Sequence, residues 1–523
     1  MKEEKCFTVE NLTEMINASR AYREKLLQDP YRPVYHFAIP EDDGRPGDVN
    51  GAFFADGVYH IMYLYKNSET NAYHWGHISS MDLLHWRHHP DALTSEEGDA
   101  GCFSGGAFVD EDGTAYLSFW KFPSKDYAKD NGGIVLACAK PPYEKWERMY
   151  PIAIEGNKEP WGTLDIVKNG VVEHTGCQDP SNIWKHDGWY YMQIGALTVL
   201  SEWGCKEDSD PHYQGDWTEL YRSRDLKTWE YMDRFYTNTH AGEDWPDETE
   251  DDMCPSFLPL YDARENGQKT DKWLQLFIAH NKGCQYYIGT YENERFYPEI
   301  HGRMNWSDSK HLGYFAPEAL IDDKKRHIIW TWLADNPEKD FEKYGWSGVF
   351  SFPRTVWLED GILKMAPAGE LDQLQHHHQM LRPDENGSIS VRNGEIFRMK
   401  AVFDTSRDTK LGFKVRVSED DSQFAEIYYD KEKQFLILDT NNAGSEGCKI
   451  TEKAPLSLVM HELLSLDIFV DKSVIEVYAN EKQAMCRRVY PDNPSKAVGV
   501  KMIGSTESLL ALDAWEMAPT NPY

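Results

Sequence analysis

Four Asp-Gly pairs divide the chain into short runs of aromatic and β-branched residues. An Asp-Gly pair between two such runs is a strong signal for a two-residue β-hairpin. The pairs are Asp56-Gly57, Asp112-Gly113, Asp187-Gly188 and Asp360-Gly361. This pattern begins near residue 33, whereas residues 8–28 show the apolar spacing of a helix. We therefore expect an all-β protein with a short N-terminal helix.

A weak internal repeat indicates how the strands are arranged. Residues 80–86 and 223–229 share the form S-x-D-L-x-x-W, and each copy follows a predicted strand. Repeated four-stranded units separated by turns are typical of a β-propeller. Further apolar runs near the C-terminus predict a separate β-sandwich. We divide the chain into a helical extension (1–32), a propeller (33–366), a linker (367–382) and a sandwich (383–523).

The predicted linker contains three adjacent histidines, His376, His377 and His378. Neighbouring side chains of an extended chain point in different directions, so a connection between domains is favoured over a metal site. We predict no metal ion and no cofactor for this chain.

The charge of the chain limits its partners. With a net charge of -32, it lacks the basic surface that nucleic acid or an anionic membrane requires. No apolar run is long enough to span a membrane, and the polar start does not resemble a signal peptide. The nine cysteines show no paired spacing, which favours a reducing compartment. We expect a cytoplasmic protein with a neutral substrate, and the N-terminal helix leaves self-association open.

Three places in the sequence hold acids beside predicted strands. Asp48 lies in a Pro/Gly turn before an aromatic strand, where it is either a nucleophile or the anchor of an Asx-turn. Asp179 precedes Pro180, which favours an extended conformation. Residues 248–252 crowd four acids, so that one of them could hold its proton, although a solvated acidic loop is the alternative. Cleavage of a glycosidic bond commonly needs two carboxyl groups.

These residues resemble the motifs of the family 32 glycoside hydrolases, the invertase, inulinase and levanase group. Asp48 in G-D-V-N-G resembles the nucleophile motif W-M-N-D-P-N-G, Asp179 in Q-D-P resembles R-D-P, and residues 253–255 (M-C-P) resemble the E-C-P motif that carries the acid/base. The likeness extends from about residue 34 to the end of the chain. Supporting matches lie at residues 74–77, 82–86, 103–105, 314–316, 345–348 with 353–354, and 468–478.

The resemblance implies a five-bladed β-propeller followed by a β-sandwich. It also implies retaining transfer of a β-linked fructosyl unit without a metal or cofactor. In that scheme Asp48 attacks the anomeric carbon and Asp179 stabilises the transition state. The residues expected to line the substrate site are Asn50, Trp75, Phe103, Ser104, Gln178 and Tyr314.

The largest departure from the family pattern is Met253, which occupies the acid/base position and cannot donate a proton. Side chains alternate along a strand, so Asp251 is the first substitute and Asp252 the second, and Glu250 is a further one if the loop bulges. Gln178 also replaces the arginine of R-D-P, which removes a charge.

Two classes of function remain open. The first is an enzyme that cleaves sucrose, fructo-oligosaccharides, fructan or difructose anhydride, or a fructotransferase. The second is a fructan-binding protein that has kept the fold and lost the chemistry. Retention of both Asp48 and Asp179 favours the enzyme.

Overall fold

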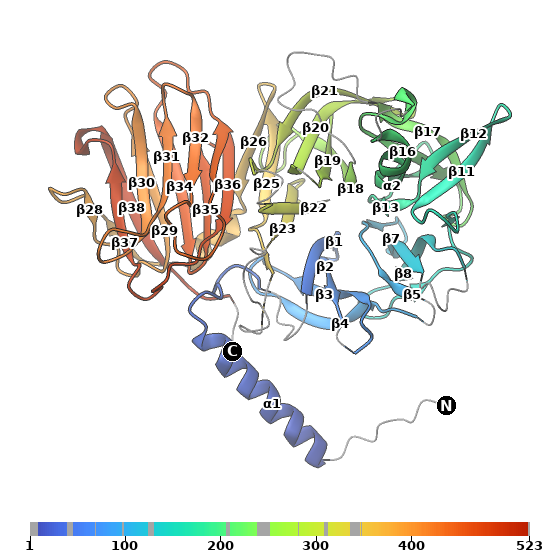
Figure 1. Ribbon diagram of the computed structural model, residues 1–523, viewed down its shortest axis with the longest axis horizontal. Helices are drawn as coiled ribbons and strands as arrows, with labels where there is room; N and C mark the ends of the chain where they lie inside the picture. Colours follow the sequence, from blue (N-terminus) through green and yellow to red (C-terminus); the bar gives the residue numbers. More distant parts are fainter. Residues whose placement is uncertain are drawn as a thin grey trace.

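The computed structural model describes residues 9–38, 45–67, 69–96, 99–123, 130–205, 210–237, 252–280, 282–307, 312–334, 346 and 348–520. Strands dominate, and they form two bodies that lie side by side (Figure 1). The first body is a five-bladed β-propeller and the second is a β-sandwich, as the sequence predicts.

The propeller consists of five antiparallel groups of strands, blades I to V. Blade I contains β1 (Arg45–Ala55), β2 (Val58–Lys66), β3 (Tyr73–Ser80) and β4 (Arg87–Leu93). Blade II contains β6 (Ala107–Val109), β7 (Ala115–Pro123), β8 (Gly133–Ala139), β9 (Glu147–Arg148) and β10 (Ile154–Glu155). Blade III contains β13 (Gln178–Pro180), β14 (Trp184–His186), β15 (Trp189–Gly195), β16 (Trp217–Ser223) and β17 (Trp229–Thr237).

The remaining blades complete the ring. Blade IV contains β18 (Met253–Tyr261), β19 (Lys269–Ala279), β20 (Gly283–Glu292) and β21 (Arg295–Arg303). Blade V contains β22 (Tyr314–Ile321), β23 (His327–Leu333), β24 (Val349–Phe350), β25 (Arg354–Glu359) and β26 (Ile362–Pro367). The strand β5 (Asp99–Cys102) joins blades I and II, and β11 (Thr163–Lys168) with β12 (Val171–Gly176) forms a separate hairpin. The first strands β1, β13, β18 and β22 lie around the centre (Figure 1), and β6, the first strand of blade II, packs against β1.

The residues in the turns explain where the propeller strands reverse direction. In three of the four predicted Asp-Gly turns both residues have positive φ, as the type I′ hairpin requires. The two copies of S-x-D-L-x-x-W form the same turn, one between β3 and β4 and the other between β16 and β17. Asp82 and Asp225 each accept two backbone N–H groups in these turns, and the following leucines have φ of 64° and 60°. The repeat therefore marks equivalent corners of two blades.

The sandwich packs two six-stranded sheets around one apolar core. One sheet has the order β27 (Gln375–Met380), β38 (Leu509–Met517), β29 (Ile396–Phe403), β34 (Leu464–Asp471), β35 (Val474–Ala479) and β36 (Gln483–Arg488). The other has the order β28 (Ser388–Ile389), β37 (Gly499–Ile503), β30 (Lys410–Val417), β31 (Ala425–Asp430), β32 (Phe435–Asp439) and β33 (Thr451–Pro455). The stretch 367–382, expected as a linker, holds a 3-10 helix and the edge strand β27 of the first sheet.

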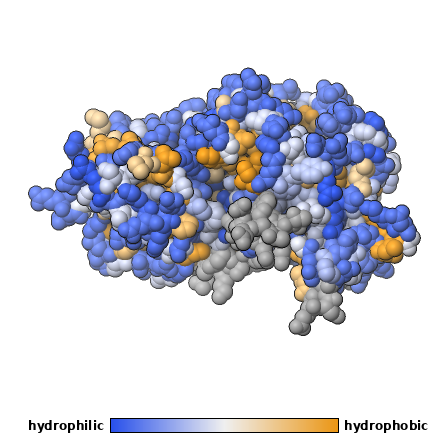
Figure 2. Space-filling model, turned by 90° about the horizontal axis from the view of Figure 1, so that it is seen from above, coloured by the Kyte–Doolittle hydropathy of each residue, from blue (hydrophilic) through white to orange (hydrophobic). Residues whose placement is uncertain are grey.

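The helix α1 (Val9–Gln28) precedes the propeller and extends away from both bodies (Figure 1). Its C-terminal end is anchored, because Leu26 is buried in a core cluster and Tyr22 packs against the same cluster. No helix in the described ranges has the length and hydropathy needed to cross a membrane. The face in Figure 2 is mostly hydrophilic, and its hydrophobic residues form small groups.

A buried carboxylate ties the start of the propeller to the sandwich. Asp471, at the end of β34, accepts backbone N–H groups from Val34, Tyr35 and His36 at 2.8–2.9 Å. The His36 ring lies between the carboxylates of Asp471 (3.0 Å) and Glu476 (3.4 Å). Both acids are fully buried, so these contacts replace the water that a carboxylate otherwise requires.

We expect Asp471→Ala to lower the free energy of unfolding by about 3–5 kcal/mol, because it leaves buried donors without an acceptor. Urea denaturation followed by tryptophan fluorescence measures the change. Glu419→Ala is the control, since it removes only an exposed ion pair with Lys496 and should cost less than about 1 kcal/mol. Equal losses in the two variants would contradict the assigned role of Asp471.

Candidate active site

Four of the five central strands are interrupted by a β-bulge. The register shifts in β1, β13, β18 and β22, and a residue with positive φ lies within each shift. These residues are Gly51 (54°), Asp179 (35°), Cys254 (49°) and Ala316 (50°). A bulge re-aims the side chains beside it, and strained backbone of this kind gathers at functional sites. The bulges therefore mark one end of the propeller centre as the candidate site.

Side chains from three blades and one loop meet at this end: Asp48 of blade I, Asp179 of blade III, Cys254 of blade IV, and Ser104 of the loop between β5 and β6. The Ser104 hydroxyl donates a hydrogen bond to Asp48 Oδ2. The Cys254 thiol lies 3.6 Å from the same Asp48 oxygen and 3.4 Å from Asp179 Oδ2. Since the thiol has a single proton, it can donate to only one of the two carboxylates at a time. Residues separated by about 200 positions in the sequence thus form one cluster.

Burial changes the proton affinity of both acids. Burial raises the pKa of Asp48, and the hydrogen bonds from Ser104 and Cys254 oppose that rise. Burial, followed by the negative charge of Asp48, raises the pKa of Asp179 to about 7. Two neighbouring buried carboxyl groups do not readily ionise together. Near neutral pH the pair therefore favours one negative charge and one proton.

No sequence motif singles out His280. This residue follows β19, and its ring lies edge-on to Phe315 at 5.9 Å between ring centroids. Its positive charge when protonated lowers the pKa of both Asp48 and Asp179. A histidine directly after a strand end is the only sequence signal that could have identified it.

Met253 lies in an apolar cluster beside the acids. Cys254, Ile278, Phe315 and Ala316 are buried with it, and the partly buried members of the cluster are Leu197, Leu312 and Trp332. The position that carries a carboxyl group in the E-C-P motif is thus surrounded by apolar side chains.

The two acids predicted to replace that carboxyl group have different positions. Asp251 lies outside the described residues. Asp252 is fully buried, and Tyr236 of β17 donates a hydrogen bond to its Oδ2 at 2.5 Å. The charge of Asp252 adds to burial in raising the pKa of Asp216 well above its ordinary value, so these two acids are neighbours. Asp252 therefore belongs to a cluster between blades III and IV.

Two predicted substrate-binding residues support the loops of the site. Asn50 accepts a hydrogen bond from the Gly105 N–H at 3.2 Å, which links the strand of Asp48 to the residue after Ser104. The Gln178 side chain accepts a hydrogen bond from the Thr198 N–H at 2.8 Å. Both side chains are buried and serve backbone groups.

The three predicted aromatic residues lie in different surroundings. Trp75 is fully buried in an apolar cluster with Phe119. Tyr314 is also fully buried, and the Arg354 guanidinium lies 4.2 Å from its ring centroid. Phe103 is partly exposed and contacts Tyr73, Trp120 and Phe122. Of the three, Phe103 alone is partly exposed to solvent.

Comparison with known families identifies this architecture. The Glycosyl hydrolases family 32 N-terminal domain matches residues 42–367, and the family's C-terminal domain matches residues 370–516. A levanase of Bacillus subtilis is 26% identical, covering 93% of this chain and 70% of that protein. A sucrose-6-phosphate hydrolase of Zymomonas mobilis is 25% identical, covering 93% of this chain and 92% of that protein.

Solved structures show the same fold. Fructan 1-exohydrolase IIa from Cichorium intybus superposes with a TM-score of 0.72 at 20% identity, covering 94% of this chain and 98% of the other. Sucrose-6-phosphate hydrolase from Lactobacillus gasseri gives a TM-score of 0.74 at 20% identity, covering 97% of each chain. Because the two family domains match most of its length, the chain belongs to glycosyl hydrolase family 32 and is a glycosidase.

Proposed function

We propose that this protein hydrolyses β-fructofuranosyl linkages with retention of configuration. The family assignment and relatives named levanase, fructan 6-exohydrolase and sucrose-6-phosphate hydrolase support a fructoside substrate. The observation that carries the proposal is the cluster in which Asp48 and Asp179 both contact the Cys254 thiol. A furanose ring bound at this end of the propeller would therefore meet both carboxyl groups.

In the proposed reaction Asp48 attacks the anomeric carbon and the bond to the leaving oxygen breaks. The Ser104 hydrogen bond stabilises the ionised form of Asp48 and fixes the oxygen that accepts it, so the second oxygen is the attacking atom. Asp179 hydrogen-bonds to fructose hydroxyl groups and stabilises the positive charge of the transition state. Water then cleaves the fructosyl ester, and the second inversion restores the original configuration.

The leaving oxygen needs a proton, and we assign the role of proton donor to Asp251. Met253 cannot provide it, and Asp252 is engaged with Tyr236 between two blades. Asp251 directly precedes these two residues in the sequence, and it is the acid that alternation along a strand assigns to the same side as Met253.

We expect Asp251→Asn to lower kcat on sucrose or inulin by roughly 10²–10⁴-fold, the usual contribution of a general acid. The kcat of the same variant on an aryl β-fructofuranoside should fall much less, because the aryl leaving group departs without a proton. Initial rates on the two substrate types measure the difference. Glu111→Gln, which changes an exposed acid of blade II, is the control and should leave both rates near the wild-type values. Equal losses of Asp251→Asn on both substrates would reject Asp251 as the proton donor.

Substrate and stereochemistry are tested together. The protein is incubated with sucrose, inulin, levan and difructose anhydrides, and released fructose is measured. NMR spectra recorded early in the reaction should show β-fructofuranose as the first product, before mutarotation forms the other isomers of fructose. Initial release of the α-anomer would contradict the retaining mechanism.

A fructan-binding protein without catalysis is the second candidate, favoured by the apolar surroundings of Met253. It predicts binding of fructan without release of fructose. In that case Met253→Glu, which restores a carboxyl group, should introduce hydrolysis that the parent protein lacks. Turnover of any fructoside by the unmodified protein excludes this candidate.

A further inference from the structure

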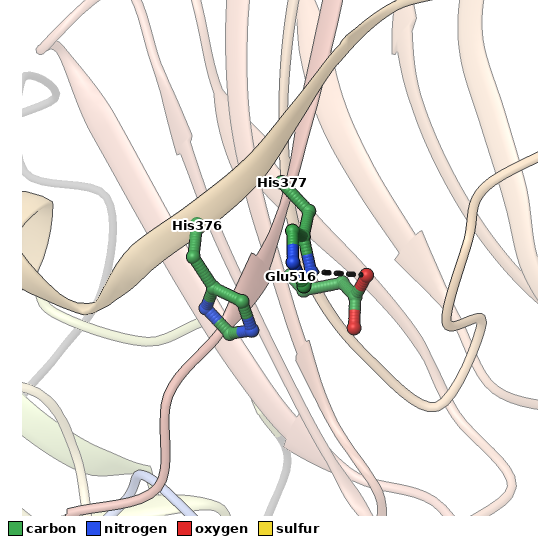
Figure 3. A group of neighbouring side chains, drawn as sticks. All are labelled: His376, His377 and Glu516. Atoms are coloured by element: carbon green, nitrogen blue, oxygen red, sulfur yellow. Dashed lines mark hydrogen bonds and ion pairs between the residues drawn. The ribbon is translucent and has the colours of Figure 1, made fainter.

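A second group of chemically active side chains lies in the sandwich, remote from Asp48 in the fold. His376 and His377 of β27 and Glu516 of β38 each place one possible metal-ligand atom within 4.8 Å of the others (Figure 3). The two histidines are exposed and Glu516 is 19% exposed at its side chain. Nothing in the fructosidase chemistry uses this group.

A β-bulge brings the two consecutive histidines together. His376 pairs with Glu516 and Gln379 with Ala514, so β27 contains one residue more than β38 between these pairs. The bulge includes His377, whose φ is 51°. In a regular strand the two rings would point to opposite faces, whereas here their centroids are 4.7 Å apart. The structure therefore overturns the sequence-based argument that adjacent histidines must diverge.

The hydrogen bonds leave suitable atoms for a cation. His376 Nδ1 lies 3.3 Å from the Leu374 carbonyl oxygen, and donation to it leaves Nε2 with its lone pair. A histidine held in this way through one nitrogen is the usual arrangement for a metal ligand. His377 Nδ1 lies 2.9 Å from Glu516 Oε1, so this carboxylate either orients the ring or binds the cation beside it.

We propose that His376, His377 and Glu516 bind a divalent cation of the Zn²⁺ class at the edge of the sandwich. Two imidazoles and one carboxylate suit Zn²⁺, Ni²⁺ or Cu²⁺ better than Mg²⁺ or Ca²⁺, which prefer oxygen ligands. A tetrahedral Zn²⁺ site needs ligand atoms about 3.4 Å apart, which follows from Zn–N bonds of about 2.0–2.1 Å. Rotation of the exposed His377 side chain closes the remaining gap, and water completes the coordination.

One competing contact is present at the site. Arg392 Nε lies 3.3 Å from Glu516 Oε1, in an ion pair whose arginine is 57% exposed. An exposed pair of this kind contributes little energy, so a cation with two histidine ligands can displace it. The bound cation would join β27, the edge strand, to β38 and so fasten the edge of this sheet.

The experiment is isothermal titration of the untagged full chain with ZnCl₂. Cys205 is an exposed thiol that could bind zinc by itself, so every protein carries Cys205→Ser. We expect one Zn²⁺ per chain, and we expect His376→Ala, His377→Asn and Glu516→Gln each to weaken binding by a factor on the order of ten or more. Asparagine is chosen at position 377 because it tolerates positive φ.

His378→Ala is the matched control. His378 is the next histidine in the chain, but it bonds to Asp513 at 2.7 Å and stacks on Trp515. The His378→Ala variant should therefore bind Zn²⁺ as tightly as the parent protein. The proposal is overturned if the parent binds no Zn²⁺, if the three ligand variants keep the parent's affinity, or if His378→Ala weakens binding as much as they do. Circular dichroism confirms that each variant is folded.

Discussion

Replacing Asp48 by asparagine should abolish hydrolysis of fructosides, lowering kcat by a factor on the order of 10⁴ or more. Asparagine has nearly the same size as aspartate and can still accept the Ser104 hydrogen bond. It cannot form the covalent ester, because an amide oxygen is a far weaker nucleophile than a carboxylate. Affinity for fructoside should change much less than kcat, since the shape of the site is kept.

Release of fructose measures this loss, and titration with fructan measures binding. Asp56→Asn is the control, because it makes the same chemical change in the exposed hairpin turn of blade I. An Asn-Gly pair suits that turn, so fold and activity should both be unchanged. Retention of more than a tenth of the wild-type kcat by Asp48→Asn would show that another residue is the nucleophile.

The fold could be predicted because its main signals are local. An Asp-Gly pair fixes a hairpin through two backbone angles, and the repeat at Asp82 and Asp225 forms its turn with hydrogen bonds only two or three residues long. The edge strand β27 was missed because its polar residues, among them three histidines, lack the alternation of a half-buried strand.

The arrangement of the candidate site was harder to predict because it depends on bulges. Alternation along a strand is reliable only where the register is regular. The bulge after Met253 gives Cys254 a positive φ and directs its thiol toward two acids, a contact that no local pattern encodes. Asp252 lies on the other side of Met253 in the sequence, and it accepts a hydrogen bond from Tyr236 on the neighbouring blade.

A motif match also does not say which side of a strand a residue faces. Trp75 and Tyr314, which the resemblance assigns to the substrate site, are fully buried in core clusters, and their role at the site stays a prediction. Phe103 and Ser104 come from one loop, and Ser104 directly contacts Asp48. Of the residues expected to line the substrate site, Ser104 is thus one whose side chain contacts an acid.

Asp179→Asn should stabilise the folded protein at alkaline pH while impairing catalysis. In the folded state the pKa of Asp179 is about 7, compared with an ordinary value of 3.8. Between these pH values the folded protein holds a proton that the unfolded chain has released, so stability falls as pH rises toward 7. Above pH 7 the buried charge lowers the free energy of unfolding by its full amount. This amount is at most about 4 kcal/mol, because each pKa unit corresponds to about 1.4 kcal/mol. Asparagine has no charge to bury, and it tolerates the φ of 35° at this position.

Guanidinium denaturation at pH 4 and pH 8 tests this expectation. The variant should match the wild type at pH 4 and exceed its free energy of unfolding at pH 8, because only the wild type then buries a second charge beside Asp48. Asp187→Asn, in an exposed hairpin turn, should change stability by less than about 0.5 kcal/mol at either pH. If Asp179→Asn were less stable than the wild type at pH 8, the hydrogen bond from Cys254 would outweigh the burial of charge. Asp179 would then be part of the structural support of the fold, and the strained position it occupies in β13 would have no catalytic explanation.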